Sequence, residues 1–434
     1  MSRNTRNPYA VRWSKFADGE RMPFLVWAAT GIPMQAPTYW VVSKRRPSGV
    51  QPNTLHNDLR ALMYLYLWAD ARGVDLQDRF ESGALLTLTE VTDLDTFCGR
   101  YLDEAVGELP DQNGHVIRLV VRKSNNKKKA SRRTVNLLEK RNRLAAVHSF
   151  IEYTSADHLS RLHLWPDRWG HYSSVRDNCL KWIRSRYEAI KKPSRNDLGA
   201  REGLEEAEVA RLRAAIEPDH PENPFEPKVR FRNYLIISLL LGLGVRRGEL
   251  LGIRVEDVQL GSNGTVTVHR RPDDPDDPRK VQPSSKTEAR VLPLSGRLTD
   301  LLYEWIVHHR SKIVGARRHP FLIVDCDEGR PLSLSSVNKL MRALRSRVPG
   351  LPEKLSAHVL RHSWNDAFSD AMDRKGVPGD QEAKWRARLM GWRREESAEA
   401  YLRRTVRRRS NEVLVELQDS LDIQHHGAAG SARP

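Results

Sequence analysis

A short polar stretch at residues 192–201, with the sequence KPSRNDLGAR, constrains the fold most because the residue pattern differs on its two sides. The pattern before it is basic and helical, and the pattern after it combines helices with strands. The stretch contains Pro and Gly and has no hydrophobic period, so it predicts a linker. The chain has 434 residues, enough for two or three domains of roughly 100–200 residues each. We therefore expect two separately folded parts, joined by a linker at residues 192–202.

The N-terminal part is basic and helical in pattern. Apolar residues recur at helical spacing over residues 54–75 and again over residues 131–153, where lysines and arginines occupy the other side. A third basic helix is predicted at residues 174–191. These segments predict a basic helical domain over residues 46–191.

The first 45 residues have a different pattern. The runs PFLVWA (residues 23–28) and TYWVVS (residues 38–43) are short and β-like, and Gly and Pro separate them. We treat residues 1–45 as an N-terminal segment of unassigned structure.

The C-terminal part combines helices with a few strands. Two apolar helical segments are predicted at residues 232–251, strands at 265–270 and 289–294, and further helices up to residue 421. We expect a domain over residues 203–421 and a disordered tail over residues 422–434. The predicted fold class is mainly α with a small antiparallel β-sheet, namely a helical domain followed by a mixed α/β domain.

Composition excludes several classes of protein. The longest apolar run, residues 234–245, is 12 residues long, whereas a membrane-spanning helix needs about 20. The N-terminus lacks the apolar stretch of a secretory signal. Cys98, Cys179 and Cys326 form no CxxC pair, which argues against a disulfide framework and a cysteine zinc site. A reducing compartment fits, and we expect the cytoplasm.

The net charge of +17 indicates a polyanionic partner, with DNA or RNA first in line. The excess is concentrated between His115 and Ala145, where 11 basic residues accompany one acidic residue. A merely solubilising helix face is the simpler explanation, and a helix laid against phosphates is the alternative. The candidate DNA contacts are Arg122, Lys123, Lys127, Lys128, Lys129, Arg132, Arg133, Lys140, Arg141 and Arg143.

Two charged positions in the C-terminal part are candidates for chemistry. Arg246 follows a long apolar helix and precedes Leu250 and Leu251, and a cation at the edge of a buried segment needs an anionic partner. Glu249 supplies one as an ordinary helical pair. Lys286 comes just before a predicted strand, where a hairpin turn exposes it, although most such lysines only solvate a turn.

A helix capped by Ser356 would carry His358 in its first turn, with Arg361 and His362 on the same face. An arginine and a histidine at a helix N-terminus suit a phosphate. Zinc is the competing interpretation because the two histidines have the spacing of metal ligands. Val359 stands where a metalloprotease helix carries its glutamate and no third ligand suggests itself, so we favour phosphate. The core-facing side of this helix is expected to hold Leu360, Trp364 and Ala367.

Tyr401 lies nine residues after Trp392, which follows a helix-ending or helix-bending Gly391. A tyrosine at helical spacing is usually packing. Nearby cations, however, favour the phenolate form of a hydroxyl whose ordinary pKa is about 10. Five arginines follow the tyrosine, namely Arg403, Arg404, Arg407, Arg408 and Arg409.

Together, these segments make residues 203–421 resemble the tyrosine recombinase (phage integrase) family. The positions that match the family's motifs are Gly244, Val245, Arg246, Glu249, Leu250, Asp257, Lys286, His358, Arg361, Gly391, Trp392 and Tyr401. Residues 46–191 resemble the family's helical core-binding domain only in pattern, and this resemblance implies a core-type DNA-binding domain there. One departure from the family's pattern is Trp392, which stands in place of the usual histidine. An indole N–H donates a hydrogen bond but accepts no proton, so this position can stabilise charge without acting as an acid or base.

The resemblance implies that Tyr401 attacks a DNA phosphodiester and forms a covalent 3′-phosphotyrosine, which conserves the bond energy without ATP. Arg246 and Arg361 would hold the non-bridging oxygens, and Trp392 would add a neutral donor. No metal or other cofactor is expected, because cationic side chains supply the electrostatics.

The remaining matched residues have supporting or proton-transfer roles in this interpretation. Lys286 would protonate the leaving 5′ oxygen, and His358 would assist the proton transfer from the tyrosine. His362 would support the catalytic residues without itself contacting the phosphate. Glu249 and Asp257 would hold the first arginine and the helix ends rather than touch DNA.

The resemblance implies double-stranded DNA as partner and a tetramer of protomers on two paired sites, and an accessory DNA-bending factor is a further candidate. An amphipathic segment at residues 410–421 is expected to dock on a neighbouring protomer. We expect the enzyme to serve a mobile genetic element. A type IB topoisomerase, a hairpin-forming resolvase, a DNA-binding protein without catalysis and a metal-dependent nuclease remain alternatives.

Overall fold

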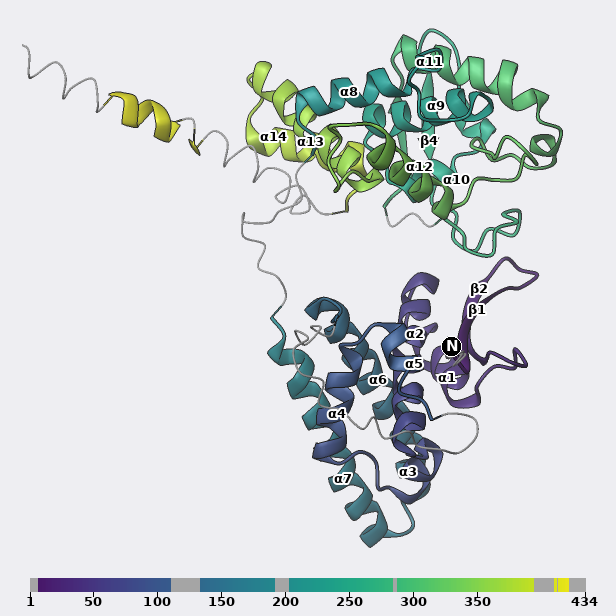
Figure 1. Ribbon diagram of the computed structural model, residues 1–434, viewed down its shortest axis with the longest axis vertical. Helices are drawn as coiled ribbons and strands as arrows, with labels where there is room; N and C mark the ends of the chain where they lie inside the picture. Colours follow the sequence, from purple (N-terminus) through teal and green to yellow (C-terminus); the bar gives the residue numbers. More distant parts are fainter. Residues whose placement is uncertain are drawn as a thin grey trace, which may run out of the picture. The chain divides into compact units, whose positions relative to one another are not determined.

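The chain divides into two compact units, Met1–Ser194 and Arg195–Pro434, and each is described by itself (Figure 1). Within the described residues helices predominate and the strands form two small antiparallel sheets, which confirms the predicted fold class. None of the helices in this part of the chain has the length and apolar character that a membrane crossing requires. The computed structural model describes residues 7–110, 133–191, 203–283, 287–393, 410–411 and 413–420.

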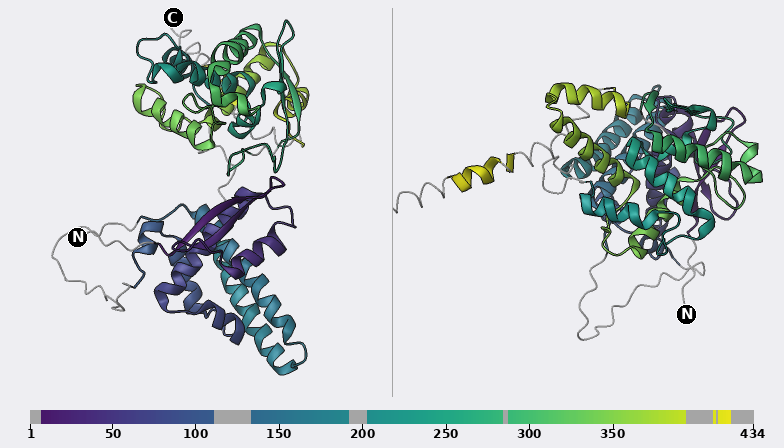
Figure 2. Two further views of the ribbon diagram at one scale, coloured as in Figure 1. Left: turned by 90° about the vertical axis from the view of Figure 1, so that its right-hand side faces the viewer. Right: turned by 90° about the horizontal axis from the view of Figure 1, so that it is seen from above.

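An antiparallel hairpin of β1 (Tyr9–Lys15) and β2 (Arg21–Trp27) opens the first unit and contains most of the predicted run PFLVWA (Figure 2). The hairpin packs on α2 (Pro52–Arg72), where the Tyr9 hydroxyl donates to the Asp70 carboxylate at 2.8 Å. Its buried residues Tyr9, Met22 and Leu25 belong to the same hydrophobic cluster as those of the following helices. The N-terminal segment and the helical region are therefore one compact unit.

The expectation of a strand at TYWVVS is wrong. These residues lie in α1 (Gln35–Trp40) and in the π-helical turn η1 (Val41–Arg45). The neighbouring side chains Trp40 and Val41 are both fully buried. Adjacent residues of a strand point to opposite faces, whereas adjacent residues of a helix can both reach one core.

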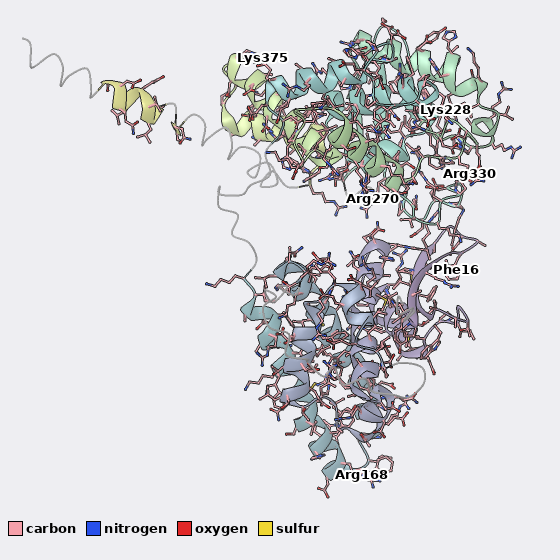
Figure 3. The ribbon with its side chains drawn as sticks, in the orientation of Figure 1. Phe16, Arg168, Lys228, Arg270, Arg330 and Lys375 are labelled. Carbon is pink, nitrogen blue, oxygen red and sulfur yellow. The ribbon has the colours of Figure 1, made fainter. Side chains whose placement is uncertain are left out.

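The three predicted helices of the first unit are present with shifted ends. Gly73 ends α2 with a φ of 65°, a left-handed conformation that suits glycine. Asn136 caps α6, because its side chain accepts a hydrogen bond from the Glu139 amide at 2.8 Å. The helices α6 and α7 lie side by side (Figures 1 and 2), and Arg168 lies near the end of this pair (Figure 3). The remaining bounds are α3 (Leu76–Ser82), α4 (Leu88–Cys98), α5 (Leu102–Val106), α6 (Leu137–Arg161) and α7 (Pro166–Ala189).

The second unit packs helices around a three-stranded antiparallel sheet in the order β3-β4-β5, with Val266 opposite Leu292. The strands are β3 (Val258–Gln259), β4 (Thr265–Val268) and β5 (Arg290–Pro293). The helices are α8 (Glu206–Ile216), α9 (Pro227–Leu243), α10 (Arg247–Gly252), α11 (Gly296–Tyr303), α12 (Leu334–Arg347), α13 (Ala357–Arg374) and α14 (Gly379–Met390). Shorter helical turns are η2 (Val255–Asp257), η3 (Glu304–His309), η4 (Arg310–Lys312) and η5 (Val314–Arg318).

The acidic loop at residues 271–279, between β4 and β5, packs against the rest of the second unit. Asp274 and Asp277 are only 6% and 1% exposed, although a loop of this acidic composition is typical of a solvated turn. Asp274 accepts from Arg254 at 2.7 Å, and Asp277 pairs with Arg279. Arg279 in turn donates to the carbonyls of Leu251 and Leu332 and lies over the Phe321 ring. The ion pairs Arg254–Asp274 and Arg279–Asp277 thus fix this part of the connection.

Candidate active site

The turn between α9 and α10 carries Arg246 and depends on a glycine. Gly244 follows α9 with a φ of 60°, and a Cβ there would lie 2.6 Å from the Trp364 ring. Arg246 is the N-cap of α10, which begins at the next residue, and its backbone amide donates to Glu249 Oε2 at 2.9 Å. Its guanidinium also donates to Glu249 Oε1 at 3.1 Å and remains partly exposed.

Glu249 is the centre of the site, with a carboxylate that is fully buried. Oε1 accepts from the Arg246 guanidinium and from the Thr287 hydroxyl at 2.7 Å, while Oε2 accepts from the Arg246 amide and from Arg290 at 2.8 Å. Burial alone would raise the pKa of this carboxyl. The charges of Arg290 and Arg361 and the hydrogen bonds outweigh burial and hold the pKa below its ordinary value. Glu249 is therefore a buried carboxylate with its acceptor positions filled.

Arg361 reaches the same carboxylate from α13. Ser356 caps this helix by accepting from the Val359 amide, and Arg361 is 1% exposed. Its Nη1 donates to the Gly244 carbonyl at 2.6 Å and lies 3.8 Å from Glu249 Oε2. The structure thus brings Arg246 and Arg361 together around Glu249.

The faces of α13 differ from the sequence-based expectation. Arg361 is buried against the turn after α9, whereas Ala367, expected in the core, is exposed. His358 is exposed in the first turn, and its ring lies 4.6 Å from that of His362 in an edge-on arrangement. The expectation erred because the buried partner of Arg361 is a backbone carbonyl, which hydrophobic periodicity does not reveal.

Trp392 follows the C-terminus of α14 and lies beside Arg361, whose Cζ is 5.7 Å from the indole ring centroid. Gly391 ends α14 with a φ of 65°. The Gly391 carbonyl accepts from the Glu288 amide at 3.0 Å, and Arg290 donates to the Leu389 carbonyl at 2.6 Å. The segment before β5 therefore fixes the backbone from which Trp392 extends.

Gly391→Ala should destabilise the second unit by about 1–3 kcal/mol, because the positive φ and the crowding both penalise a side chain. A Cβ at Gly391 would lie 2.9 Å from Arg290 and from the Glu288 carbonyl. The matched control is Gly376→Ala, since Gly376 has a φ of 63° but nothing within 4 Å. Denaturant unfolding of both variants checks the prediction, and equal losses would show that crowding at Gly391 is unimportant.

Two predicted catalytic residues, Lys286 and Tyr401, lie outside the described residues. The residue after Lys286 is Thr287, which is 4% exposed and bonded to Glu249.

Asp257 is buried, and its carboxylate bonds to Arg271 and Arg254 rather than to Arg246. Its carboxylate accepts two hydrogen bonds from Arg271, at 2.6 and 2.9 Å, and one from the Arg254 amide at 2.8 Å. It thus fixes the start of η2 and the base of the acidic loop. The expectation that it supports a helix end fits this placement, and the expectation that it holds the first arginine is wrong.

Sequence reasoning missed Thr287 and Arg290 as parts of the site. Both are buried, and both donate to Glu249. A signal for Arg290 was present, because strand alternation places it on the same inward face as Leu292. A charged residue at an inward position needs a buried partner.

The basic residues predicted to contact DNA are only partly described. Arg133 is exposed beside Asp103, Lys140 pairs with Asp95 at 2.8 Å, and Arg141 lies over the Tyr187 ring. Arg122, Lys123, Lys127, Lys128, Lys129 and Arg132 lie outside the described residues.

Arg143 does not fit the predicted DNA contact. It is 6% exposed, donates to the carbonyls of Cys98 and Arg100, and stacks over Tyr64. Its charge is paired with Glu139. Arg143 therefore joins α6 to the end of α4 within the unit, and the expectation that it binds phosphate is wrong.

Comparison with known proteins identifies the second unit. Residues 202–408 match the phage integrase family. This part of the chain, which contains Arg246, Arg361 and Trp392, belongs to that family of tyrosine recombinases. Among the described residues, no group of three or more histidine, cysteine, aspartate or glutamate side chains is arranged to hold a metal ion.

Curated relatives include a tyrosine recombinase XerD of Halalkalibacterium halodurans, 26% identical over 156 residues that make up 36% of this chain and 45% of that protein. A tyrosine recombinase XerC of Methylobacterium sp. is 29% identical over 157 residues, 36% of this chain and 43% of that protein. The matches thus span less than half the length of these relatives. A solved lambda integrase dimer bound to a COC′ core site covers 92% of this chain and 96% of its own, with 14% identity and a TM-score of 0.45.

Proposed function

We propose that the chain is a site-specific DNA recombinase that cuts and rejoins DNA through a covalent 3′-phosphotyrosine at Tyr401. The observation that carries the proposal is the convergence of Arg246 and Arg361 on Glu249, with Trp392 beside Arg361. Two guanidiniums held by one buried carboxylate form a rigid cationic site for a single phosphate. The matching relatives are tyrosine recombinases, which supports the assignment.

In the proposed mechanism Arg246 and Arg361 hold the two non-bridging oxygens and stabilise the charge that develops as the tyrosine attacks. The Trp392 indole adds a neutral donor to the same phosphate. Tyr401 displaces the 5′ oxygen and keeps the phosphate as an ester, so the reverse attack by a new 5′ hydroxyl rejoins the strand.

Proton transfer is proposed for the two remaining groups. Lys286 protonates the leaving 5′ oxygen, and His358 takes or orients the proton of the tyrosine hydroxyl. The exposure of His358 leaves it accessible to a substrate from solvent. His362, in contact with its ring, would limit the positions that His358 can take.

Double-stranded DNA is the proposed substrate, and an exposed polar row on α12 supports it. Ser335, Asn338, Lys339 and Arg342 recur at helical spacing and are all exposed. Asn338 also accepts a hydrogen bond from Arg247, which follows the catalytic Arg246. Amide, ammonium and guanidinium groups can contact both phosphates and base edges.

We further propose that protomers assemble on paired DNA sites. We place this assembly in the cytoplasm and propose that the DNA belongs to a mobile element. Residues 413–420 are helical, and Val413, Leu414, Val415 and Leu417 are each at least 50% exposed. Such an apolar surface favours a protein partner, and a neighbouring protomer is the occupant we propose.

The test of the proposed function is a nicked suicide substrate, on which the released strand diffuses away and traps the covalent intermediate. We expect an SDS-stable protein–DNA adduct that forms equally in the presence of EDTA. Binding without an adduct would favour a DNA-binding protein without catalysis. Relaxation of supercoiled DNA that carries no target site would favour a topoisomerase-like enzyme.

A further inference from the structure

Arg290 occupies a junction that the mechanism above does not use. It is the first residue of β5, and its guanidinium is 5% exposed. One terminal nitrogen donates to Glu249 at 2.8 Å, the other donates to the Thr287 hydroxyl at 3.1 Å, and Nε donates to the Leu389 carbonyl at 2.6 Å. One side chain therefore ties α10, the segment before β5 and the end of α14.

The charges around Glu249 do not balance. Three guanidiniums, those of Arg246, Arg290 and Arg361, lie within 4 Å of a single buried carboxylate. One carboxylate can offset only one of them. The shortest of the three guanidinium contacts is that of Arg290, at 2.8 Å, against 3.1 Å for Arg246 and 3.8 Å for Arg361.

We propose that Arg290 is a positioning residue that neutralises Glu249 and thereby leaves the charges of Arg246 and Arg361 for the phosphate. Through Leu389 it also fixes the backbone that carries Trp392. This inference rests on the proposed function, because it assigns Arg246 and Arg361 to a substrate phosphate. Arg290 itself is enclosed by Glu249, Thr287 and Leu389 and does not touch the DNA.

Among the described residues, the side chains that contact the Glu249 carboxylate besides Arg290 do not change their charge near neutral pH. These groups are the guanidiniums of Arg246 and Arg361 and the hydroxyl of Thr287. An arginine remains charged at every pH of interest. Removal of Arg290 takes away the largest favourable charge at Glu249, so burial then raises the pKa of the carboxyl.

The experiment compares wild type, Arg290→Met and Arg290→Lys in single-turnover cleavage of the suicide substrate between about pH 5 and pH 8. Arg290→Met should cleave about 10–100-fold more slowly, the loss usual for an outer partner of a charged functional group. The acid limb of its pH–rate profile, where the cleavage rate falls as the pH is lowered, should move to higher pH, because a protonated Glu249 no longer holds Arg246. Arg290→Lys should keep the wild-type limb, since it retains the cation. Affinity for DNA, measured in the Tyr401→Phe background, should not change.

Arg310→Met is the matched control, because Arg310 is also buried and donates to the backbone carbonyls of Phe321, Ala316 and His319 rather than to a carboxylate. It should lower the melting temperature without moving the acid limb. If Arg290→Met does not fold, Arg290→Met combined with Glu249→Gln removes both charges, and its recovery of folded protein would support the pairing. Wild-type cleavage with an unchanged limb in folded Arg290→Met overturns the inference alone, whereas no adduct in wild type overturns the proposed function.

Discussion

The Tyr401→Phe variant should bind target DNA as tightly as wild type and form no covalent adduct with it. Phenylalanine keeps the ring and removes the only oxygen that can attack phosphorus, so the chemical step has no substitute nucleophile. Gel analysis in SDS of a labelled suicide substrate measures the loss, which should reach the detection limit.

Tyr303→Phe is the matched control for this experiment. Tyr303 belongs to the same unit, ends α11 and is 49% exposed, and it lies outside the cluster around Glu249. Its variant should form the adduct at the wild-type rate. An adduct in Tyr401→Phe equal to that of wild type would show that another side chain is the nucleophile and would refute the assignment of Tyr401.

Hydrophobic periodicity and turn residues were sufficient to predict the long helices of the first unit and the strands β4 and β5 of the second. The stripe of α2 and its end at Gly73, the alternation of β4 and the Ser356 cap of α13 are all local signals, and local signals are written in consecutive residues. The error at TYWVVS has a non-local cause. Trp40 packs edge-on against Phe150, which is 110 residues away, and this packing favours the helix over the β-propensity of the run.

The candidate site was predictable where residue type and order carry the information. Arg246, Glu249 and Arg361 were singled out from the sequence, and the structure places them together. Which arginine bonds to which oxygen was not predictable, because three cations compete for one carboxylate. The choice depends on side-chain geometry across α10, β5 and α13. The role of Arg290 is visible only when these three elements are seen packed together.

Charge patterns were the least informative signal. The sequence does not distinguish Arg143, which is buried against backbone carbonyls, from the exposed Arg133 in the same basic stretch. The β4–β5 loop likewise has a composition typical of a solvent-exposed loop, yet two of its aspartates are buried with arginine partners. Charged residues can lie in either place, and the location of the partner, which the sequence does not give, decides between them.

Replacement of Arg361 by methionine should slow cleavage about 10²–10³-fold, the loss typical for one preorganised donor to a transition state. Methionine has a similar length and fills the buried space, so the change removes charge and hydrogen bonds rather than volume. Arg361→Lys should recover only part of the rate, because an ammonium keeps the charge but lacks the planar fork that spans two acceptors. Single-turnover cleavage at saturating protein separates this effect from DNA binding.

Arg374→Met provides the control, since Arg374 lies on the same helix at its exposed C-terminal end. Melting temperatures of all three variants separate a loss of catalysis from a loss of folding, because Arg361 also bonds the Gly244 carbonyl. Arg361 contacts the turn before Arg246, lies near Glu249 and stacks beside Trp392. Cleavage at the wild-type rate by a folded Arg361→Met protein would therefore show that the phosphate binds elsewhere.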